Sequence, residues 1–361
     1  MSPLWQAPPP AFTLPDEWRV RLQPLLALPG AYLFGGALRD FLLHRPAKDY
    51  DLLLPSPVAA AARSAAAGAT LIPLDAARDI YRVVWPGGAT LDLKGYADLD
   101  AEIHQSDFTV NALMVCGATG AWDDRVGGFG DLRRNLLRAV SATAFGDDPL
   151  RVLRAVRFAA QLGLVITPKT DELLRAALPR LAAVAQERVA DELRLLANDR
   201  NAATAWRLLA LTGALDILFP VLTPARGCAQ NDFHHLDVLD HALEAARCWT
   251  EEVLPVLTRD PAWQAYFAEP LGQWARQGVV ALQLLLHDAD KPATVTADSD
   301  ERRHFYDHEV RGAALLDDPQ WRWEHCLPAF LAHEDHRRGA SAHHAAPGFD
   351  PEGRRPGGEW R

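Results

Sequence analysis

Apolar positions follow two different periods along the chain. In roughly the first 145 residues they form short alternating or continuous runs between turns that contain glycine or proline, which is typical of strands. From there to about residue 220 they recur at helical spacing. The strand-like runs are residues 32–34, 70–73, 80–85 and 90–94, and the helical runs are residues 17–28, 58–68, 170–178, 186–196 and 202–211. The pattern predicts an α/β region followed by an all-α region, with a boundary near residue 145.

The most distinctive segment is AYLFGGALRDFLLHRPAKDYDLLL, residues 31–54. A short apolar run leads into Gly35 and Gly36, and an amphipathic helical run with Arg39 comes next. Backbone N–H groups at a glycine pair and at the start of a helix can bind phosphate oxygens. A glycine pair alone is usually only a turn, so the prediction depends on the strand that comes after this helix.

That strand carries two carboxylates, Asp49 and Asp51, on either side of Tyr50. The period of two in a strand places both on one face, where they can share divalent cations. Hard carboxylate oxygens suit Mg²⁺, and two such ions can activate an attacking hydroxyl and stabilise the leaving oxygen of an in-line displacement. The order strand, glycine pair, helix and acidic strand therefore predicts a metal-dependent nucleotide site.

Two later segments add polar candidates to this site. Asp92, in the strand TLDLK, faces away from Leu91 and Leu93, so it is a candidate third carboxylate beside the other two. A solvent-facing strand residue is an equal alternative. Asp107 and Asn111, in IHQSDFTVNALMV, are four residues apart. If that segment is helical they share a face, from which they can reach a ribose hydroxyl or a metal-bound phosphate.

A glycine-rich turn, DDRVGGFGDL at residues 123–132, leads towards a predicted helix in DDPLRVLRAVRFAAQLG, residues 147–163. Asp148 and Arg151 are three apart, and an acid and an arginine presented together offer acceptors and donors to the edge of a base. Arg154 and Arg157 follow at helical spacing. These arginines belong to a larger basic set over residues 133–194 that is suited to phosphate contacts or, equally, to an ordinary helix surface.

Histidines and acids gather in the last third of the chain. His287 and Asp288 stand together after an apolar run, and His241 lies on a predicted helix before it. Imidazole with carboxylate suits a transition metal or Mg²⁺ that holds a hydrolytic water. Further histidines and acids of this region are His234, His235, His304, His308, His333 and Asp335. The joint pattern predicts a second metal site.

Composition narrows the class of protein. The net charge of −10 argues against a protein whose whole surface is basic for nucleic-acid binding, but it allows a local basic surface. Four scattered cysteines lack the spacing of a disulfide framework or a thiolate zinc site. No apolar run reaches the roughly 18 residues of a membrane span. The N-terminus lacks the basic region of a signal peptide, so a cytoplasmic protein without membrane partners is expected.

Five motifs in this order, together with a later segment, resemble the bacterial class II tRNA nucleotidyltransferases and the related poly(A) polymerases. They are GGALRD with DYD, SDFTVNAL, DDRVGGFGDL, DDPLRVLRAVRF, ERVADELRLL, and LLHDADKPAT with the preceding HLDVLDH. The last of these resembles the HD phosphohydrolase domain that many bacterial members carry. The resemblance covers roughly residues 30–315.

This resemblance implies a domain order. An α/β nucleotidyltransferase head of the polymerase-beta-like fold would occupy residues 1–145, and an all-α neck and body would occupy residues 146–222. An α-helical HD domain would occupy residues 223–336, and residues 337–361 are expected to be a disordered tail. The oligomeric state does not follow from the sequence.

The resemblance also implies roles for single residues. Asp49 and Asp51 would hold two Mg²⁺ ions, with Asp92 as a third catalytic carboxylate. The tRNA 3′-hydroxyl would attack the α-phosphate of CTP or ATP and release pyrophosphate. The nucleotide would contact Gly35, Gly36, Arg39, Asp107, Asn111, Asp148, Arg151, Arg154 and Arg157. A divalent metal of unknown identity in the HD region would be held by His241, His287, Asp288 and, least securely placed, Asp335.

Three departures from the family pattern leave the nucleotide specificity open. Gln105 and Ser106 stand where the family usually has two arginines, and Asp147 stands where it usually has glutamate. The span between DYD and SDFTVNAL lacks a long flexible loop, an absence associated in the family with addition of the two cytidines only. The sequence therefore favours a CC-adding enzyme, with full CCA addition next and addition of A or polyadenylation after it. An HD phosphatase or phosphodiesterase and a tRNA-binding protein without activity are the alternatives of other classes.

Overall fold

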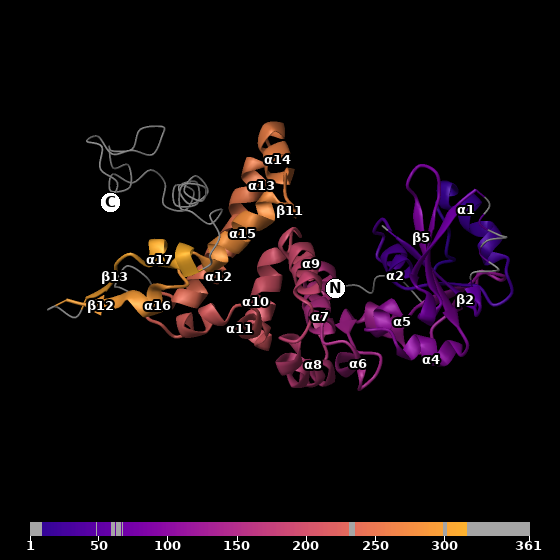
Figure 1. The fold of residues 1–361 in the computed structure, drawn as a ribbon, viewed down its shortest axis with the longest axis horizontal. Helices are drawn as coiled ribbons and strands as arrows, with labels where there is room; N and C mark the ends of the chain where they lie inside the picture. Colours follow the sequence, from indigo (N-terminus) through magenta and orange to yellow (C-terminus); the bar gives the residue numbers. More distant parts are fainter. Residues whose placement is uncertain are drawn as a thin grey trace. The chain divides into compact units, whose positions relative to one another are not determined.

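The structure is a computed structural model that describes residues 9–47, 49–58, 62, 66, 68–230, 235–298 and 302–315 (Figure 1). The chain divides into two compact units. The first comprises Met1–Arg151 with Leu162–Ala177, and the second comprises Val152–Gln161 with Leu178–Arg361. The alanine-rich helix expected over residues 58–68 lies mostly outside the described residues, as does the tail expected over residues 337–361.

A seven-stranded mixed sheet organises the first unit, in the order β3-β4-β5-β2-β1-β6-β7. Strands β2 and β5 run parallel, and the other neighbours run antiparallel. The strands are β1 (Tyr32–Phe34), β2 (Tyr50–Pro55), β3 (Thr70–Asp75), β4 (Ile80–Val84), β5 (Thr90–Tyr96), β6 (Met114–Cys116) and β7 (Trp122–Asp123). The mixed α/β head expected from the strand-like runs is thereby confirmed.

The alternating pattern of β5 shows how the sequence sets this sheet. Leu91 and Leu93 are buried, while Asp92 and Lys94 on the opposite face are partly exposed, as the alternation predicts. Gly87 and Gly88 have φ of 94° and 86°, the left-handed region that glycine adopts without steric cost, and they turn the chain from β4 into β5. Leu53 of β2, which pairs in register with Lys94, belongs to an apolar cluster with Ile103, Ala112 and Met114.

Short helices complete the first unit. They are α1 (Asp16–Leu26), α2 (Gly36–Leu42), α4 (Leu99–His104), α5 (Gly128–Arg133) and α6 (Ala144–Asp147), with 3₁₀ turns η1 (Ala76–Arg78) and η2 (Thr109–Asn111). Two expectations are corrected. The glycine-rich segment at residues 123–132 contains helix α5, because the Asp124 carboxylate accepts hydrogen bonds from the N–H groups of Gly127, Gly128 and Phe129. Residues 103–115 are not an α-helix but a helix end, a 3₁₀ turn and a strand.

Helices α7 (Arg151–Leu162) and α8 (Pro168–Leu181) run through both units, and short strands β8 (Leu136–Leu137) and β9 (Val165–Ile166) pair in the first. The second unit begins with α9 (Gln186–Ala197), α10 (Ala202–Thr212), α11 (Ala214–Leu218) and the 3₁₀ helix η3 (Pro220–Ala225). These positions confirm the helical runs expected near residues 170–211. Trp206, fully buried on α10, anchors the core of this part.

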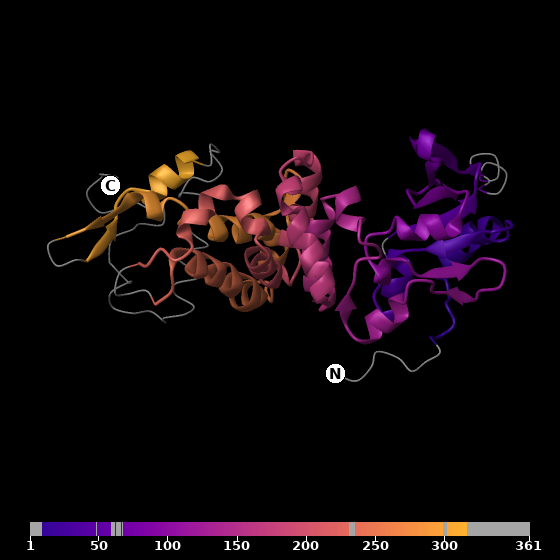
Figure 2. The ribbon, with the colours of Figure 1, turned by 90° about the horizontal axis from the view of Figure 1, so that it is seen from below.

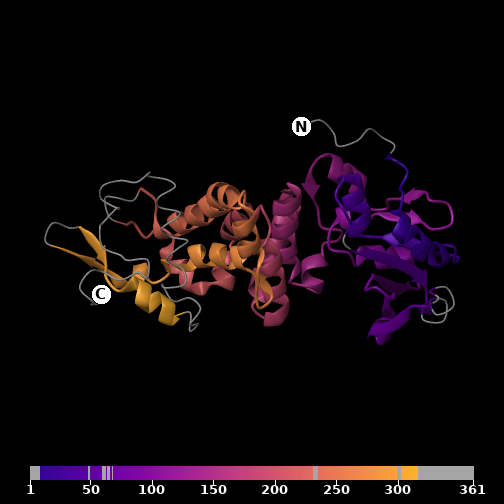
Figure 3. The same cartoon turned by 90° about the horizontal axis from the view of Figure 1, so that it is seen from above.

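The rest of the second unit places the histidine-rich segments. Helix α12 (Val238–Cys248) packs against α15 (Arg276–Leu286) and continues through the π-helix η4 (Trp249–Val253) into α13 (Leu254–Leu257). Then follow α14 (Pro261–Ala268), β10 (Pro270–Leu271), β11 (Trp274–Ala275), α16 (Lys291–Thr294), β12 (Val295–Ala297), β13 (Arg303–Phe305) and α17 (His308–Leu315). The antiparallel pair β12–β13 and helix α17 are the yellow-orange elements of Figures 2 and 3.

The structure bears on the expectations about the cysteines and about membrane spans. Cys116, Cys228 and Cys248 are free thiols, while Cys326 lies outside the described residues. In the parts of the chain that the structure describes, none of the helices combines the length and apolar character needed to cross a lipid bilayer.

Candidate functional site

The glycine pair lies directly against one of the predicted metal ligands. Gly35, between β1 and α2, has a φ of 86°, and its N–H donates to the carbonyl of Leu113 at 3.1 Å. A Cβ atom added there would lie 3.1 Å from Oδ2 of Asp51. Glycine at this position therefore serves both the backbone conformation and the close approach of a carboxylate. Gly36 begins α2, and the guanidinium of Arg39 lies beside it.

The two predicted carboxylates lie at the start of the same strand. Asp51 is the second residue of β2 and pairs in register with Phe34 of β1 on one side and Asp92 of β5 on the other. Asp49 lies one residue before β2, in exposed chain. Of the two aspartates that were expected to alternate within one strand, only Asp51 lies in it. Asp51 and Asp92 are thus on adjacent strands and the same face, as predicted.

The third candidate carboxylate, Asp92, forms an ion pair with an arginine that was not identified from the sequence. Arg82 on β4 pairs in register with Asp92, and its Nε and a terminal nitrogen donate to the two carboxylate oxygens at 2.7 and 2.8 Å. The hydrogen bond to Asp92 raises the pKa of Arg82 most, and the negative charges of Asp49 and Asp51 raise it further. Arg82 therefore places a positive charge among all three candidate carboxylates. Counting outward from the glycine turn after β4 would have paired Arg82 with Asp92.

Three further predicted residues form one connected chain of polar contacts. The buried Arg39 donates to Oδ1 of Asn111 and, at 2.8 and 2.9 Å, to the carboxylate of Asp40. Asn111 donates from Nδ2 to Oδ1 of Asp107 at 2.9 Å, and the same oxygen accepts the N–H of Phe108. The expected helix is absent from this described segment, but the 3₁₀ turn η2 still brings Asp107 and Asn111 together.

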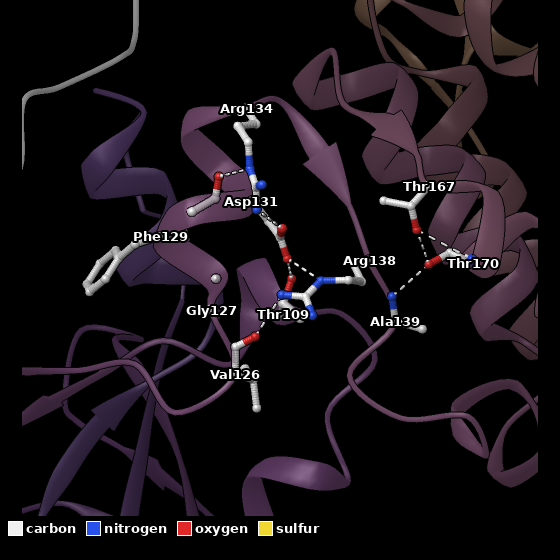
Figure 4. A network of polar contacts seen from close by, with 12 residues as sticks. Thr109, Val126, Gly127, Phe129, Asp131, Arg134, Arg138, Ala139, Thr167 and Thr170 are labelled. Carbon is white, nitrogen blue, oxygen red and sulfur yellow. Dashed lines mark hydrogen bonds and ion pairs between the residues drawn. The ribbon is translucent and has the colours of Figure 1, made fainter.

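A buried aspartate holds that 3₁₀ turn through the hydroxyl of Thr109 (Figure 4). Asp131 of α5 is 1% exposed and accepts the hydroxyl of Thr109 at 2.6 Å and Nε of Arg138 at 2.8 Å. Arg134 donates to its other oxygen at 3.2 Å, and Arg138 also donates to the carbonyl of Val126. These contacts hold η2, the 3₁₀ turn that carries Asn111. The motif containing Asp131 was noticed in the sequence, but its partners were not.

The predicted start of the helix that carries the proposed base-reading pair is wrong. Asp148 lies in extended chain between α6 and α7, and α7 begins only at Arg151. The physical reason is Pro149, because a residue before proline is driven out of the helical region. The Asp148 carboxylate accepts the N–H of Leu150 at 3.1 Å, close to the role of a helix cap. Arg151 donates its guanidinium to three backbone carbonyls, those of Gln105, Ser106 and Ala144.

Arg154 and Arg157 are held by a glutamate within the second unit. Glu192 of α9 is buried and accepts Nε of Arg157 at 2.7 Å and a terminal nitrogen of Arg154 at 3.5 Å. Both guanidinium groups also lie over the ring of Phe158, at 5.3 Å for Arg154 and 4.4 Å for Arg157. The sequence placed Glu192 in a motif without giving it a role.

The structure brings together the three best-placed ligands of the predicted second metal site. Ligand atoms of His241, His287 and Asp288 all lie within 4.8 Å of one another. Asp288 Oδ2 is 3.7 Å from Nε2 of His241 and 3.1 Å from Nε2 of His287. Nδ1 of His287 lies 2.8 Å from the carbonyl of Leu284, which fixes the ring and directs Nε2 to the cluster. This donor set fits a divalent cation; Asp335 lies outside the described residues.

Two further side chains contact Asp288. Nζ of Lys291 lies 2.7 Å from Oδ2, and Nε2 of His308 lies 3.3 Å from Oδ1. Burial alone would raise the pKa of the Asp288 carboxyl, but His287, His308 and Lys291 outweigh it and hold this pKa well below its usual range. Burial would lower the pKa of His308, and its hydrogen bond to Asp288 raises it instead. Asp288 is therefore a buried carboxylate held by Lys291 and by the rings of His287 and His308.

The sequence of this chain is similar to those of several known proteins. A family described as the probable RNA and SrmB-binding site of polymerase A matches residues 163–226. The A-adding tRNA nucleotidyltransferase of Deinococcus radiodurans is 37% identical over 295 residues, which cover 80% of this chain and 63% of that protein. The CC-adding tRNA nucleotidyltransferase of Geobacter sulfurreducens is 44% identical over 174 residues, 45% of this chain and 39% of that protein. The multifunctional CCA protein of Nitrosococcus oceani is 31% identical over 304 residues, 79% and 68% respectively.

The match covers only part of the relatives' length, and the fold is shared with a solved structure. The chain spans 63% of the Deinococcus relative and 39% of the Geobacter relative. A solved structure described as a tRNA-processing enzyme in apo form I shares the fold with a TM-score of 0.62 at 19% identity, over 91% of this chain and 78% of that one.

Proposed function

This chain belongs to the tRNA nucleotidyltransferase family, and from that premise we propose that it adds nucleotides to the 3′ end of tRNA without a nucleic-acid template. The observation that carries the proposal is the apposition of Gly35 and Asp51, with a candidate phosphate-binding turn directly against a candidate metal ligand. A protein that only binds tRNA would have no use for this arrangement.

The carboxylates of Asp49 and Asp51 fit a hard divalent cation, so we assign them to two Mg²⁺ ions. When bound, these ions would lower the pKa of the attacking 3′-hydroxyl and neutralise the triphosphate. The 3′-oxygen would form a bond to the α-phosphorus, and the bond from that phosphorus to the departing pyrophosphate would break. The protein's own contribution is to position these groups on a rigid sheet face, where charge stabilisation does most of the work.

The remaining predicted residues have assignable tasks in this reaction. Arg39, fixed by Asp40 and Asn111, would present its guanidinium to the triphosphate, and Asp107 with Asn111 would hold the ribose. Asp148 and Arg151 would select the base. The contacts of Arg151 with the carbonyls of Gln105 and Ser106 support that assignment, because they tie the base-selecting segment to the segment that carries Asp107.

For the nucleotide added, we propose cytidine from CTP, two residues per tRNA. Support comes from the short span between the carboxylate strand and SDFTVNAL and from the similarity to a CC-adding relative. Addition of the terminal adenosine from ATP is the alternative supported by the Deinococcus relative, and full CCA addition by the Nitrosococcus relative.

The test uses tRNAs that end before the first C, after the first C and after the second C, each with CTP or ATP alone. The proposal predicts CMP incorporation on the first two ends and no AMP on any. AMP added to the CC end would replace the CC-adding assignment by an A-adding or CCA-adding one. The control is an Asp51→Asn variant, which should bind tRNA and add nothing.

A second function is supported by the cluster of His241, His287 and Asp288. We propose that residues 223–336 form an HD-type domain in which this cluster holds a divalent cation and hydrolyses phosphate esters. Its test is metal-dependent release of phosphate from 2′,3′-cyclic or 3′-phosphorylated RNA ends. Loss of that release in His287→Ala, with nucleotide addition unchanged, would support it, and release that persists in this variant would refute it.

A further inference from the structure

Lys291 contacts the same oxygen of Asp288 that a metal ion at the cluster of His241, His287 and Asp288 would bind. Oδ2 of Asp288 faces His241 and His287, so a cation held by these two rings has to bind that atom. Nζ of Lys291 lies 2.7 Å from the same oxygen, nearer than either imidazole nitrogen. The ammonium group and a bound metal would therefore compete for one oxygen.

Lys291 is a built-in part of this site and not a surface side chain that happens to reach it. Its side chain is 11% exposed, and its backbone N–H donates to the carbonyl of Asp288 at 3.0 Å. Nζ also donates to Oε1 of Gln230 at 2.8 Å and lies 5.6 Å from the ring centre of Phe305. Lysine is rarely this buried unless it is paired. Gln230 gives the ammonium a second partner that it can keep if it leaves Asp288.

The carboxylate cannot avoid the competition by turning. Its other oxygen, Oδ1, lies 3.3 Å from Nε2 of His308. The opposite edge of that ring is fixed as well, because Nδ1 of His308 lies 2.6 Å from the carbonyl of Phe305. Asp288 is thus held with Oδ2 towards Lys291 and the two histidines.

We propose that Lys291 is a resident counter-ion of this site that competes with a divalent cation for Asp288 and weakens metal binding there. If Lys291 were uncharged, His241, His287 and Asp288 would bind the metal more tightly. The carboxylate would then not have to release the ammonium group, and the metal would have no positive charge beside it. The inference rests on the metal site proposed above. It adds that metal occupancy is limited by a residue of the chain itself.

The test measures Co²⁺ binding to the full chain by equilibrium dialysis and by the visible absorption of the bound ion. All proteins carry Asp51→Asn, so that the carboxylate site of the first unit contributes little. Lys291→Met should lower the Kd for Co²⁺ by about tenfold or more. Lys291→Gln, which keeps a hydrogen-bonding group near Gln230, should also lower it. Lys169→Met, which removes an exposed lysine of the first unit, should leave it unchanged.

His287→Ala separates this inference from the site on which it rests. If it leaves Co²⁺ binding intact, the metal site itself is refuted. If His287→Ala weakens binding but the folded Lys291 variants show an unchanged or higher Kd, the site stands and the counter-ion role is refuted. Circular dichroism identifies variants that fail to fold. If one of Lys291→Met and Lys291→Gln does not fold, the Kd of the other is used.

Discussion

Two carboxylates of this chain are each paired with a cation from their own unit, and the two pairs differ in their access to water. Asp92 and Arg82 lie on an open sheet face, 35% and 44% exposed. Asp288 and Lys291 lie inside a helical unit, 3% and 11% exposed. Exposed ion pairs contribute little to stability because water screens them, whereas a buried charge depends on its partners. The first arrangement suits charges that have to rearrange around a passing substrate, and the second suits a charge that is fixed in place.

The largest effect is expected at Asp49, one of the two carboxylates proposed to hold metal. Replacing Asp49 by asparagine removes the charge of a proposed metal ligand with little change in the shape of the side chain. Nucleotide addition should fall by roughly 10³-fold or more, since most of the catalysis is charge stabilisation. Binding of tRNA, measured by filter binding, should be unchanged. Retention of more than a tenth of the wild-type rate would show that Asp49 is not a metal ligand.

The backbone of the open site gives the next effect. Gly35→Ala puts a Cβ atom at 3.1 Å from Oδ2 of Asp51, on a residue with a φ of 86°. We expect addition to fall at least about tenfold and the free energy of unfolding to fall by about 1–2 kcal/mol from backbone strain. Single-turnover rates and urea denaturation measure the two. Gly163→Ala is a matched control with a positive φ and open space around its Cβ position, so it should reproduce the strain without the loss of addition.

The comparison of the two pairs is tested by removing one carboxylate charge from each. Asp288→Asn leaves Lys291 and His308 buried without their anion, and should lower the free energy of unfolding by about 3–5 kcal/mol. Asp92→Asn leaves Arg82 in contact with water, and should cost less than about 1 kcal/mol. Urea denaturation in the presence of a chelator measures both. Equal losses would remove the distinction between a screened pair and a buried one.

The smallest effect concerns Arg82. Arg82→Met releases the Asp92 carboxylate beside Asp51, so the site should need a few-fold less Mg²⁺ for half-maximal addition. If Asp92 is itself a metal ligand, this gain should disappear in Arg82→Met combined with Asp92→Asn. If the Mg²⁺ requirement rises in Arg82→Met alone, Arg82 contributes to the triphosphate site instead.

How far the sequence predicted each site depends on how far apart its partners are in the chain. Gly35 and Asp51 were identified because glycine, helix and acidic strand lie within one short segment with a fixed period. The helix that was expected to start with Asp147 and Asp148 begins only at Arg151, because Pro149 drives the residue before it out of the helical region. Arg82 and Lys291 were missed for another reason. Each matters only through its partner, and the pairing depends on strand register or on the packing around a buried carboxylate.

The same reason explains Asp131 and Glu192. Both are buried acids whose arginine and threonine partners come from other elements, so their motif letters indicated importance but not the contact. By contrast, the joint occurrence of His241, His287 and Asp288 was correctly predicted to form a cluster. His287 and Asp288 directly follow the apolar helix α15, and α12, which carries His241, packs against that helix. This packing brings the three side chains together.

Nucleotide addition by the unmodified protein can be measured on a tRNA that lacks its terminal CCA. This tRNA is incubated with the chain, Mg²⁺ and radiolabelled CTP, and the products are separated at single-nucleotide resolution. We expect extension by two cytidines and no extension when Mg²⁺ is removed by a chelator. Failure to extend any tRNA end with either CTP or ATP would refute the proposal that this chain adds nucleotides to tRNA.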